Sequence, residues 1–186
     1  MTETPIAPEG PGASDFGAGG RLLLAVAKKA AIAGGLVFVV LVLMSLASIV
    51  GRKLFALPVP GDVETLQMCA AFASSAFFAY CHLVGGDVKV DFFTHNLAPR
   101  KVALLDAFGS LLVGLFGALI TWRTAVGALA VQEVGETSAV LGWPVWIAQA
   151  LMLPGFALLA AAGFYLCVHK LLTAARIGVL EGEARA

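Results

Sequence analysis

Charge is scarce in this sequence. Of its 186 residues, 13% are Asp, Glu, Lys or Arg, whereas 60% are hydrophobic and the mean hydropathy is +0.92. A water-soluble domain needs about twice that charged fraction to cover its surface, so the composition excludes an ordinary soluble fold. The formal net charge is zero, which leaves no electrostatic basis for binding nucleic acid.

Motifs for catalysis and metal binding are also missing. The chain has three cysteines, Cys69, Cys81 and Cys167, which lie within or at the ends of apolar runs and form no CxxC pair. We expect them to pack as small hydrophobic side chains rather than to form disulfides or hold a metal. No glycine-rich phosphate loop, nucleophile–base pairing or HExxH spacing occurs. The sequence therefore predicts no enzyme and no cofactor.

Residues 1–20 lack a basic side chain, although they carry acids and are rich in Pro, Gly and Ala. A secretory signal needs a basic stretch before a short apolar run, and the first apolar run here is too long for that. It should therefore remain in the membrane. We expect residues 1–20 to form a disordered tail, residues 21–175 a membrane domain and residues 176–186 a cytoplasmic tail.

What the sequence does have is four long apolar runs. Each is sufficient to cross the hydrocarbon core of a bilayer as a helix, and the spans are expected at about residues 29–51, 65–85, 102–123 and 144–169. Asp106 and Arg123 bracket the third apolar run and should each lie near one interface. In the fourth, Pro144 should occupy the first turn and Pro154 should kink or restart the helix. The predicted fold class is an all-α integral membrane protein with four transmembrane helices.

Lysine and arginine are distributed unevenly around these spans. Nine lie in the N-terminal flank, the loop after the second span and the C-terminal tail: Arg21, Lys28, Lys29, Lys89, Arg100, Lys101, Lys170, Arg176 and Arg185. Only three, Arg52, Lys53 and Arg123, fall on the other side. Because basic residues accumulate on the cytoplasmic side of a membrane, both termini should be cytoplasmic.

The aromatic residues point to the same orientation. Tryptophan and tyrosine gather at the two membrane interfaces, and here they fall near the predicted ends of the spans. The tryptophans are at the outer ends and the tyrosines near the inner ends: Trp122, Trp143, Trp146, Tyr80 and Tyr165.

A charged hinge, residues 85–93 (Gly-Gly-Asp-Val-Lys-Val-Asp-Phe-Phe), joins the second and third spans. Val90, Phe93 and Leu97 share one helical face, which predicts a short amphipathic helix lying in the cytoplasmic interface between spans 2 and 3. Pro99 should then begin the third helix. This segment is either an ordinary connector or an element that docks a partner.

Other features leave alternatives open. Small residues in spans 2 and 3, including Gly114-x-x-x-Ala118, serve either packing within the bundle or a face for another membrane protein. The acidic residues before spans 2 and 4 either interact favourably with the dipoles of these helices or form a rim to which a periplasmic partner docks. They are Asp62, Glu64, Glu133 and Glu136. His82 and His169 come near the cytoplasmic ends of their helices, where histidines are far more often solvated than bound to a haem.

Ionisable residues are almost absent from within the spans, and no internal repeat is visible. A carrier that moves its substrate without a partner would be expected to have ionisable residues within its spans and an internal repeat. The pattern favours a scaffold or an accessory subunit.

Three regions carry a resemblance to a known family. They are residues 61–66 (Gly-Asp-Val-Glu-Thr-Leu), residues 86–91 (Gly-Asp-Val-Lys-Val-Asp) and residues 135–146, which contain Gly-Glu-Thr-Ser and then Leu-Gly-Trp-Pro-Val-Trp. Over about residues 28–172 the chain resembles the small, DctQ-like membrane subunit of tripartite ATP-independent periplasmic (TRAP) transporters. Asp87 stands where that family usually has His, so a role tied to that imidazole does not carry over. We expect the hinge to keep its fold.

The resemblance implies a division of labour. In such systems a periplasmic binding protein captures an organic acid, and a large membrane subunit moves it across the bacterial inner membrane, driven by a sodium gradient. The small subunit anchors the large one, so substrate and sodium sites belong to the partner. The candidate contact residues are Glu64 and Glu136 on the outer side, with Lys89 and Asp91 in the hinge.

Three other interpretations remain. The chain is a stand-alone redox carrier that holds haem between His82 and His169, a self-contained small transporter or channel, or a scaffold of an unrelated complex.

Overall fold

The computed structural model describes residues 16–56, 59–87 and 99–183, with side chains described up to residue 178. These ranges contain four helices, α1 (Ala18–Phe55), α2 (Asp62–Leu83), α3 (Pro99–Val134) and α4 (Val145–Glu183). Outside the helices, Thr137 and Pro144 form an isolated antiparallel bridge, and the described ranges include no strand. Each helix is long and apolar enough to cross a membrane. The predicted all-α fold with four membrane-spanning helices is confirmed.

Three of the helices are longer than a bilayer requires. With 22 residues, α2 is about 33 Å long and matches the hydrocarbon core. By contrast, α1, α3 and α4 have 38, 36 and 39 residues and extend beyond it. Residues 18–20, which the sequence assigned to a disordered tail, are the first residues of α1. Gly20 lets this part of α1 pack closely on α4, because a Cβ there would lie 2.2 Å from the Tyr165 hydroxyl.

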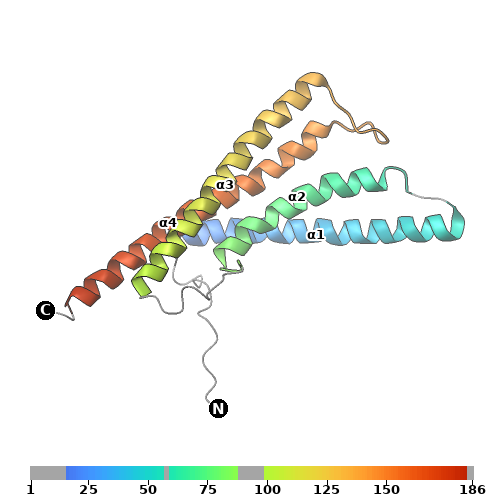
Figure 1. Ribbon diagram of the computed structural model, residues 1–186. Coiled ribbons are helices and arrows are strands. Elements are labelled where there is room, and N and C mark those ends of the chain that lie inside the picture. The colour runs from blue at the N-terminus through green and yellow to red at the C-terminus, as the bar shows by residue number, and fades with distance from the viewer. Residues whose placement is uncertain (1–15, 57–58, 88–98, 184–186) are drawn as a thin grey trace, which may run out of the picture.

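The helices form two hairpins, α1 with α2 and α3 with α4, that meet through α2 and α4. Figure 1 shows the start of α1 and the last turns of α4 at the same end of the bundle, which we call the terminal end. The two hairpins lie against each other there and diverge towards the opposite end. The buried apolar core contains residues of α1, α2 and α4: Ala27, Ala79, Leu83, Phe156, Leu159, Ala162 and Leu166.

Small residues bring the helix backbones together. A Cβ on Gly163 of α4 would lie 2.4 Å from the backbone N of Gly114 on α3, and one on Gly117 would lie 2.8 Å from the backbone N of Ala160. Between α1 and α2, Gly34 would meet a backbone carbonyl at 2.8 Å. For Gly114 and Gly117 of the third span, the alternative of packing within the bundle is confirmed. In lipid, van der Waals contact replaces the hydrophobic drive between helices.

The three prolines that the sequence singled out have different outcomes. Pro99 begins α3 as predicted. Pro144 was expected in the first turn of the last helix, but it lies directly before Val145, outside α4. Pro144 forms the isolated bridge to Thr137 instead, and the helix begins at the next residue. Pro154 lies inside the continuous helix α4, so the helix does not restart there.

Large apolar side chains cover the outside of the bundle, most densely on α1 and α3. They include Leu36, Val40, Leu43, Phe108, Leu112, Phe116 and Leu119, which are all more than 45% exposed. Such faces are stable only against lipid or another membrane protein. The predicted interfacial helix between spans 2 and 3 lies in residues 88–98, outside the described residues.

Candidate functional sites at the two ends of the bundle

The loop between α3 and α4, at the end opposite the termini, is closed by its own backbone. The Ser138 N–H donates to the Trp143 carbonyl at 2.8 Å, and the Gly142 N–H donates to the Ser138 carbonyl at 3.1 Å. The Val145 N–H donates to the Glu136 carbonyl at 3.2 Å. Gly142 has a positive φ of 66°, a conformation that glycine adopts without a steric penalty. This loop therefore has a defined shape before any partner binds.

Glu64 of α2 holds this loop. Its Oε1 accepts a hydrogen bond from the Val140 N–H at 2.8 Å, and its Oε2 accepts one from the Leu141 N–H at 3.1 Å. Gly61, directly before α2, allows the approach, because a Cβ there would lie 2.5 Å from the Leu141 side chain. We call this arrangement of Glu64 with Val140 and Leu141 the Glu64 clamp. It joins the two hairpins at the end where their helices diverge.

Glu64 was predicted to contact a partner, and the structure brings its carboxylate to this chain's own loop. Sequence reasoning missed that contact because the bonded amides are 76 and 77 residues away. The only signal was that two of the three motif regions, 61–66 and 135–146, contain the residues that meet. Glu136 lies in the same loop, and its side chain is exposed, so it keeps its place as a contact candidate.

Asp62 connects α1 to α2 beside the clamp. Its carboxylate accepts a hydrogen bond from the Ser48 hydroxyl at 2.5 Å and lies 3.2 Å from Nη2 of Arg52. It also accepts the N–H of Val63 at 2.8 Å, within the first turn of α2. Ser48 is almost fully buried near the end of the apolar sequence of α1. The sequence explained Asp62 through the helix dipole but gave no indication of Ser48.

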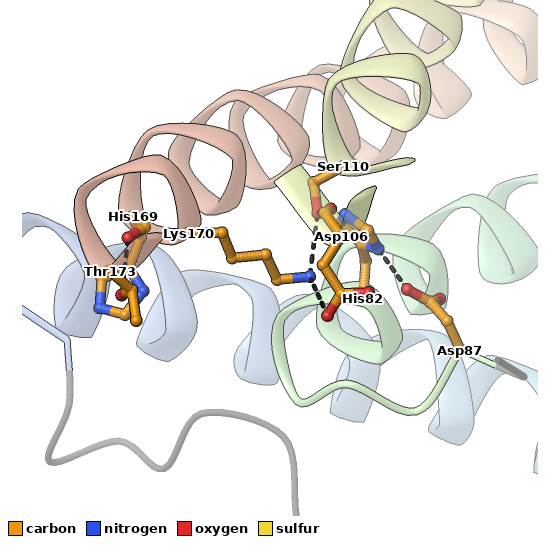
Figure 2. Close-up of polar contacts among 7 residues, drawn as sticks. All are labelled: His82, Asp87, Asp106, Ser110, His169, Lys170 and Thr173. Atoms are coloured by element: carbon orange, nitrogen blue, oxygen red, sulfur yellow. Dashed lines mark hydrogen bonds and ion pairs between the residues drawn. The ribbon is translucent and has the colours of Figure 1, made fainter. Parts of the chain in front are cut away.

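A second group of polar residues lies at the terminal end. Lys170 of α4 donates to the Ser110 hydroxyl at 3.2 Å and lies 3.6 Å from the Asp106 carboxylate of α3. Next to them, Nδ1 of His82 on α2 pairs with the Asp87 carboxylate. Figure 2 shows these side chains converging from α2, α3 and α4. We call His82, Asp87, Asp106, Ser110 and Lys170 the polar cluster.

His82 corrects an expectation from the sequence. A solvated interfacial histidine was expected, but His82 is only 5% exposed. Gly85, with a positive φ of 69°, turns the chain after α2 so that Asp87 returns to the ring. A buried imidazole needs such a hydrogen-bonding partner. Asp87, at the position where the resembling family has His, thus fixes the first residues of the hinge to α2.

The remaining predicted hinge residues cannot be placed in this network. Lys89 and Asp91 fall in residues 88–98, outside the described residues. Their proposed ordering of the hinge stays a prediction. The cluster members Asp106, Ser110 and Lys170 were not predicted to meet, although Asp106 was correctly placed near the end of an apolar run.

The two histidines do not face each other. The His169 ring lies 5.7 Å from the Phe16 ring and 6.2 Å from the Tyr165 ring, measured between centroids. Figure 2 places His169 and His82 on opposite sides of Lys170. Across the ranges with described side chains, no group of three His, Cys, Asp or Glu residues is suited to a metal ion. The geometry gives no support to a haem held between His82 and His169.

An apolar cavity of about 340 Å³ lies between α2 and the start of α4. Its lining comes from the two helices and the loop that precedes α4: Met68, Cys69, Phe72, Trp143, Pro144, Ile147, Ala148 and Leu151. No charged side chain lines it, so it lacks the groups that would recognise an organic acid.

Between the two ends the helices carry no formal charge. This holds from Lys29 to Arg52, from Glu64 to His82, from Asp106 to Arg123 and from Val145 to His169. Ion and proton pathways use ionisable side chains at membrane depth. The arrangement therefore suits a structural element whose hairpins are tied at both ends, rather than a pathway through this chain.

The ion pair in the polar cluster gives a direct test of that structural role. Asp106→Asn and Lys170→Met should each lower the free energy of unfolding by about 1–2 kcal/mol, because each leaves one partly buried charge without its partner. The double variant should lose less than the sum of the two. Reversible unfolding in mixed micelles measures this double-mutant cycle. If the loss in the double variant equals the sum of the two single losses, the ion pair contributes nothing to the free energy of unfolding.

Comparison with known families gives one finding. The family described as the DctQ component of tripartite ATP-independent periplasmic transporters matches residues 41–173. The match covers more than half of the chain and includes the Glu64 clamp and the polar cluster. No curated protein and no solved structure is significantly similar to the chain.

Proposed function

This chain belongs to the DctQ family, the small membrane component of tripartite ATP-independent periplasmic transporters, and on that premise we propose that it is the scaffold subunit of a sodium-coupled importer of an organic acid. Family membership makes it part of a transporter. The scaffold role, the sodium coupling and the class of substrate are the proposal.

The chain acts in the bacterial inner membrane with both termini in the cytoplasm. The supporting observation is the uneven distribution of Lys and Arg, nine on the side of the termini and three on the other. In Figure 1 the start of α1 and the last turns of α4 lie at the same end of the bundle, which is compatible with it. The Glu64 clamp and Glu136 then lie on the periplasmic side, where the binding protein arrives.

The large membrane subunit carries the substrate and sodium sites and packs against this chain. Two features support this assignment. The spans lack charged residues that would bind an anion or a cation. The outward faces of α1 and α3 retain large exposed apolar side chains, such as Leu43, Phe108 and Phe116, which a second membrane protein can cover. No cofactor is required in this chain.

The family match carries this proposal, and co-purification tests it. Tagged chain is extracted from native membranes in mild detergent, and its partners are identified by mass spectrometry. We expect a large, many-span membrane protein, with or without a periplasmic binding protein. Recovery of a homogeneous monomer, under conditions that preserve other membrane complexes, would contradict the scaffold role.

The hinge gives a residue-level prediction. Asp91→Lys should lower recovery of the large subunit and the rate of uptake together, while the preference among substrates stays the same, because the sites that select substrate belong to the partner. Transport assays in cells and the pull-down measure these quantities. The matched control is Glu181→Lys, the same charge reversal near the end of α4, at the same end of the bundle. Unchanged uptake and recovery in Asp91→Lys would disprove a role for this residue.

A further inference from the structure

A second cavity, also of about 340 Å³, opens at the terminal end between the start of α1 and the last turns of α4. Its lining is mixed: Gly17, Tyr165, Val168, His169, Leu172, Thr173 and Arg176. Tyr165, His169, Thr173 and Arg176 follow one another at intervals of three or four residues and therefore share one face of α4. Val168 and Leu172 form an apolar strip beside them. The proposed transport function does not use this cavity.

The depth of the cavity corresponds to the headgroup region of a bilayer. The Lys170–Asp106 pair lies next to the end of α2, the helix whose length matches the hydrocarbon core. Tyr165 is therefore just inside this level. Arg176, which is six residues beyond Lys170, lies about 9 Å further out along the helix. A cavity that changes from apolar to polar over this distance suits a molecule that is itself amphipathic.

The polar side of the cavity is suited to an anion. Arg176 supplies a permanent positive charge and lies exposed at the rim. Its guanidinium group can donate two parallel hydrogen bonds to a phosphate group. Among the described residues that line the cavity, none is Asp or Glu.

Packed aromatic rings form the floor of the cavity. The His169 ring stacks on Tyr165 and meets Phe16 edge-on, with centroids 6.2 and 5.7 Å apart. The Thr173 hydroxyl donates to the His169 carbonyl at 3.0 Å, which fixes the position of that side chain on the face of α4 (Figure 2). The first amides of α1, after Gly17, add the positive end of a helix dipole. A Cβ on Gly17 would meet no atom of the described residues within 4 Å.

We propose that this cavity binds the phosphate headgroup of an anionic phospholipid from the leaflet on the side of the termini. Arg176 contacts the phosphate, and the acyl chains run along Val168 and Leu172, which are 57% and 58% exposed. A lipid would contact both the polar face and the apolar strip of the lining, whereas a free phosphate ion would leave the apolar strip without a role. Basic sites between transmembrane helices at this depth are typical of anionic lipid recognition.

Native mass spectrometry of the full chain, purified with its bound partners, tests the proposal. The probes are phosphatidylglycerol, phosphatidylcholine with the same acyl chains, and inorganic phosphate. We expect phosphatidylglycerol to remain bound in preference to phosphatidylcholine. Arg176→Gln should weaken that binding about fivefold, and Arg176→Lys should weaken it less. The matched control is Lys101→Gln, which removes the same charge at the same end but outside the cavity lining.

Three outcomes would overturn the proposal. Equal binding of the two lipids would show that no anionic headgroup is recognised. Equal losses in Arg176→Gln and Lys101→Gln would indicate a diffuse surface charge instead of a site. Displacement of lipid by millimolar phosphate would assign the cavity to a free anion. Circular dichroism of each variant shows whether it is folded. Because the readout is lipid binding, it is separate from recovery of the large subunit.

Discussion

Replacing Gly163 with alanine should loosen the α3–α4 hairpin and lower the free energy of unfolding by about 2–3 kcal/mol. The added Cβ would lie 2.4 Å from the Gly114 backbone N and 2.5 Å from the Gly114 Cα. These are backbone atoms of a neighbouring helix, so no rotamer change relieves the contact and the two helices must separate. Unfolding of the purified protein in mixed micelles, followed by circular dichroism, measures the loss.

Gly109→Ala is the matched control for this prediction. Gly109 lies on α3 near Gly114, but a Cβ there would meet no atom within 4 Å. The same methyl group should therefore leave stability unchanged or raise it slightly, because alanine favours the helix. Equal stability of Gly163→Ala and Gly109→Ala would show that the close crossing of α3 and α4 does not exist in the membrane protein.

Glu64→Gln should free the loop between α3 and α4 from α2. The carboxylate now accepts two backbone N–H groups, one on each oxygen. A glutamine amide has one acceptor oxygen. Its NH₂ group would face the second backbone N–H, so two donors would meet without an acceptor. Amide exchange at Val140 and Leu141 should become about tenfold faster. Hydrogen–deuterium exchange of the loop peptide, measured by mass spectrometry, gives this rate directly.

Glu133→Gln removes the same charge from an exposed position at the end of α3 and is the control for Glu64→Gln. It should leave exchange in the loop unchanged. The same protection in both variants and the wild type would mean that Glu64 does not hold the loop. Glu64 would then return to its first interpretation, as a residue available to a partner.

The Glu64 clamp and the polar cluster change how the family resemblance is understood. Residues 61–66 and 135–146 were recognised as separate stretches of sequence, and the structure joins them through Glu64 and the amides of Val140 and Leu141. Asp87, which stands in the hinge where the family usually has His, also has a partner within this chain, because it pairs with His82. These motif residues shape the two ends of the scaffold, while Glu136 is exposed and stays available on the loop surface.

The sequence by itself determined the class of this protein and the number of its helices. Long apolar runs and scarce charge leave the membrane as the only solvent in which the chain is stable. Because a single run of that length already specifies a helix in lipid, no tertiary information was needed. Pro99 marked the start of α3 for an equally local reason, its compatibility with a first turn.

Only the tertiary structure decided which polar groups meet. Glu64 reaches amides that are 76 and 77 residues away, and Lys170 reaches Ser110 over 60 residues. Helical periodicity places a residue on a face, but the crossing of the hairpins decides what that face contacts. The same crossing buries His82, which the sequence placed in solvent, and leaves the cavity between α1 and α4 open beside Arg176. Between the hairpins, Gly155 of α4 lies so close to α2 that a Cβ there would be 2.7 Å from the Ser75 backbone carbonyl carbon, and no local pattern specifies the geometry of that crossing.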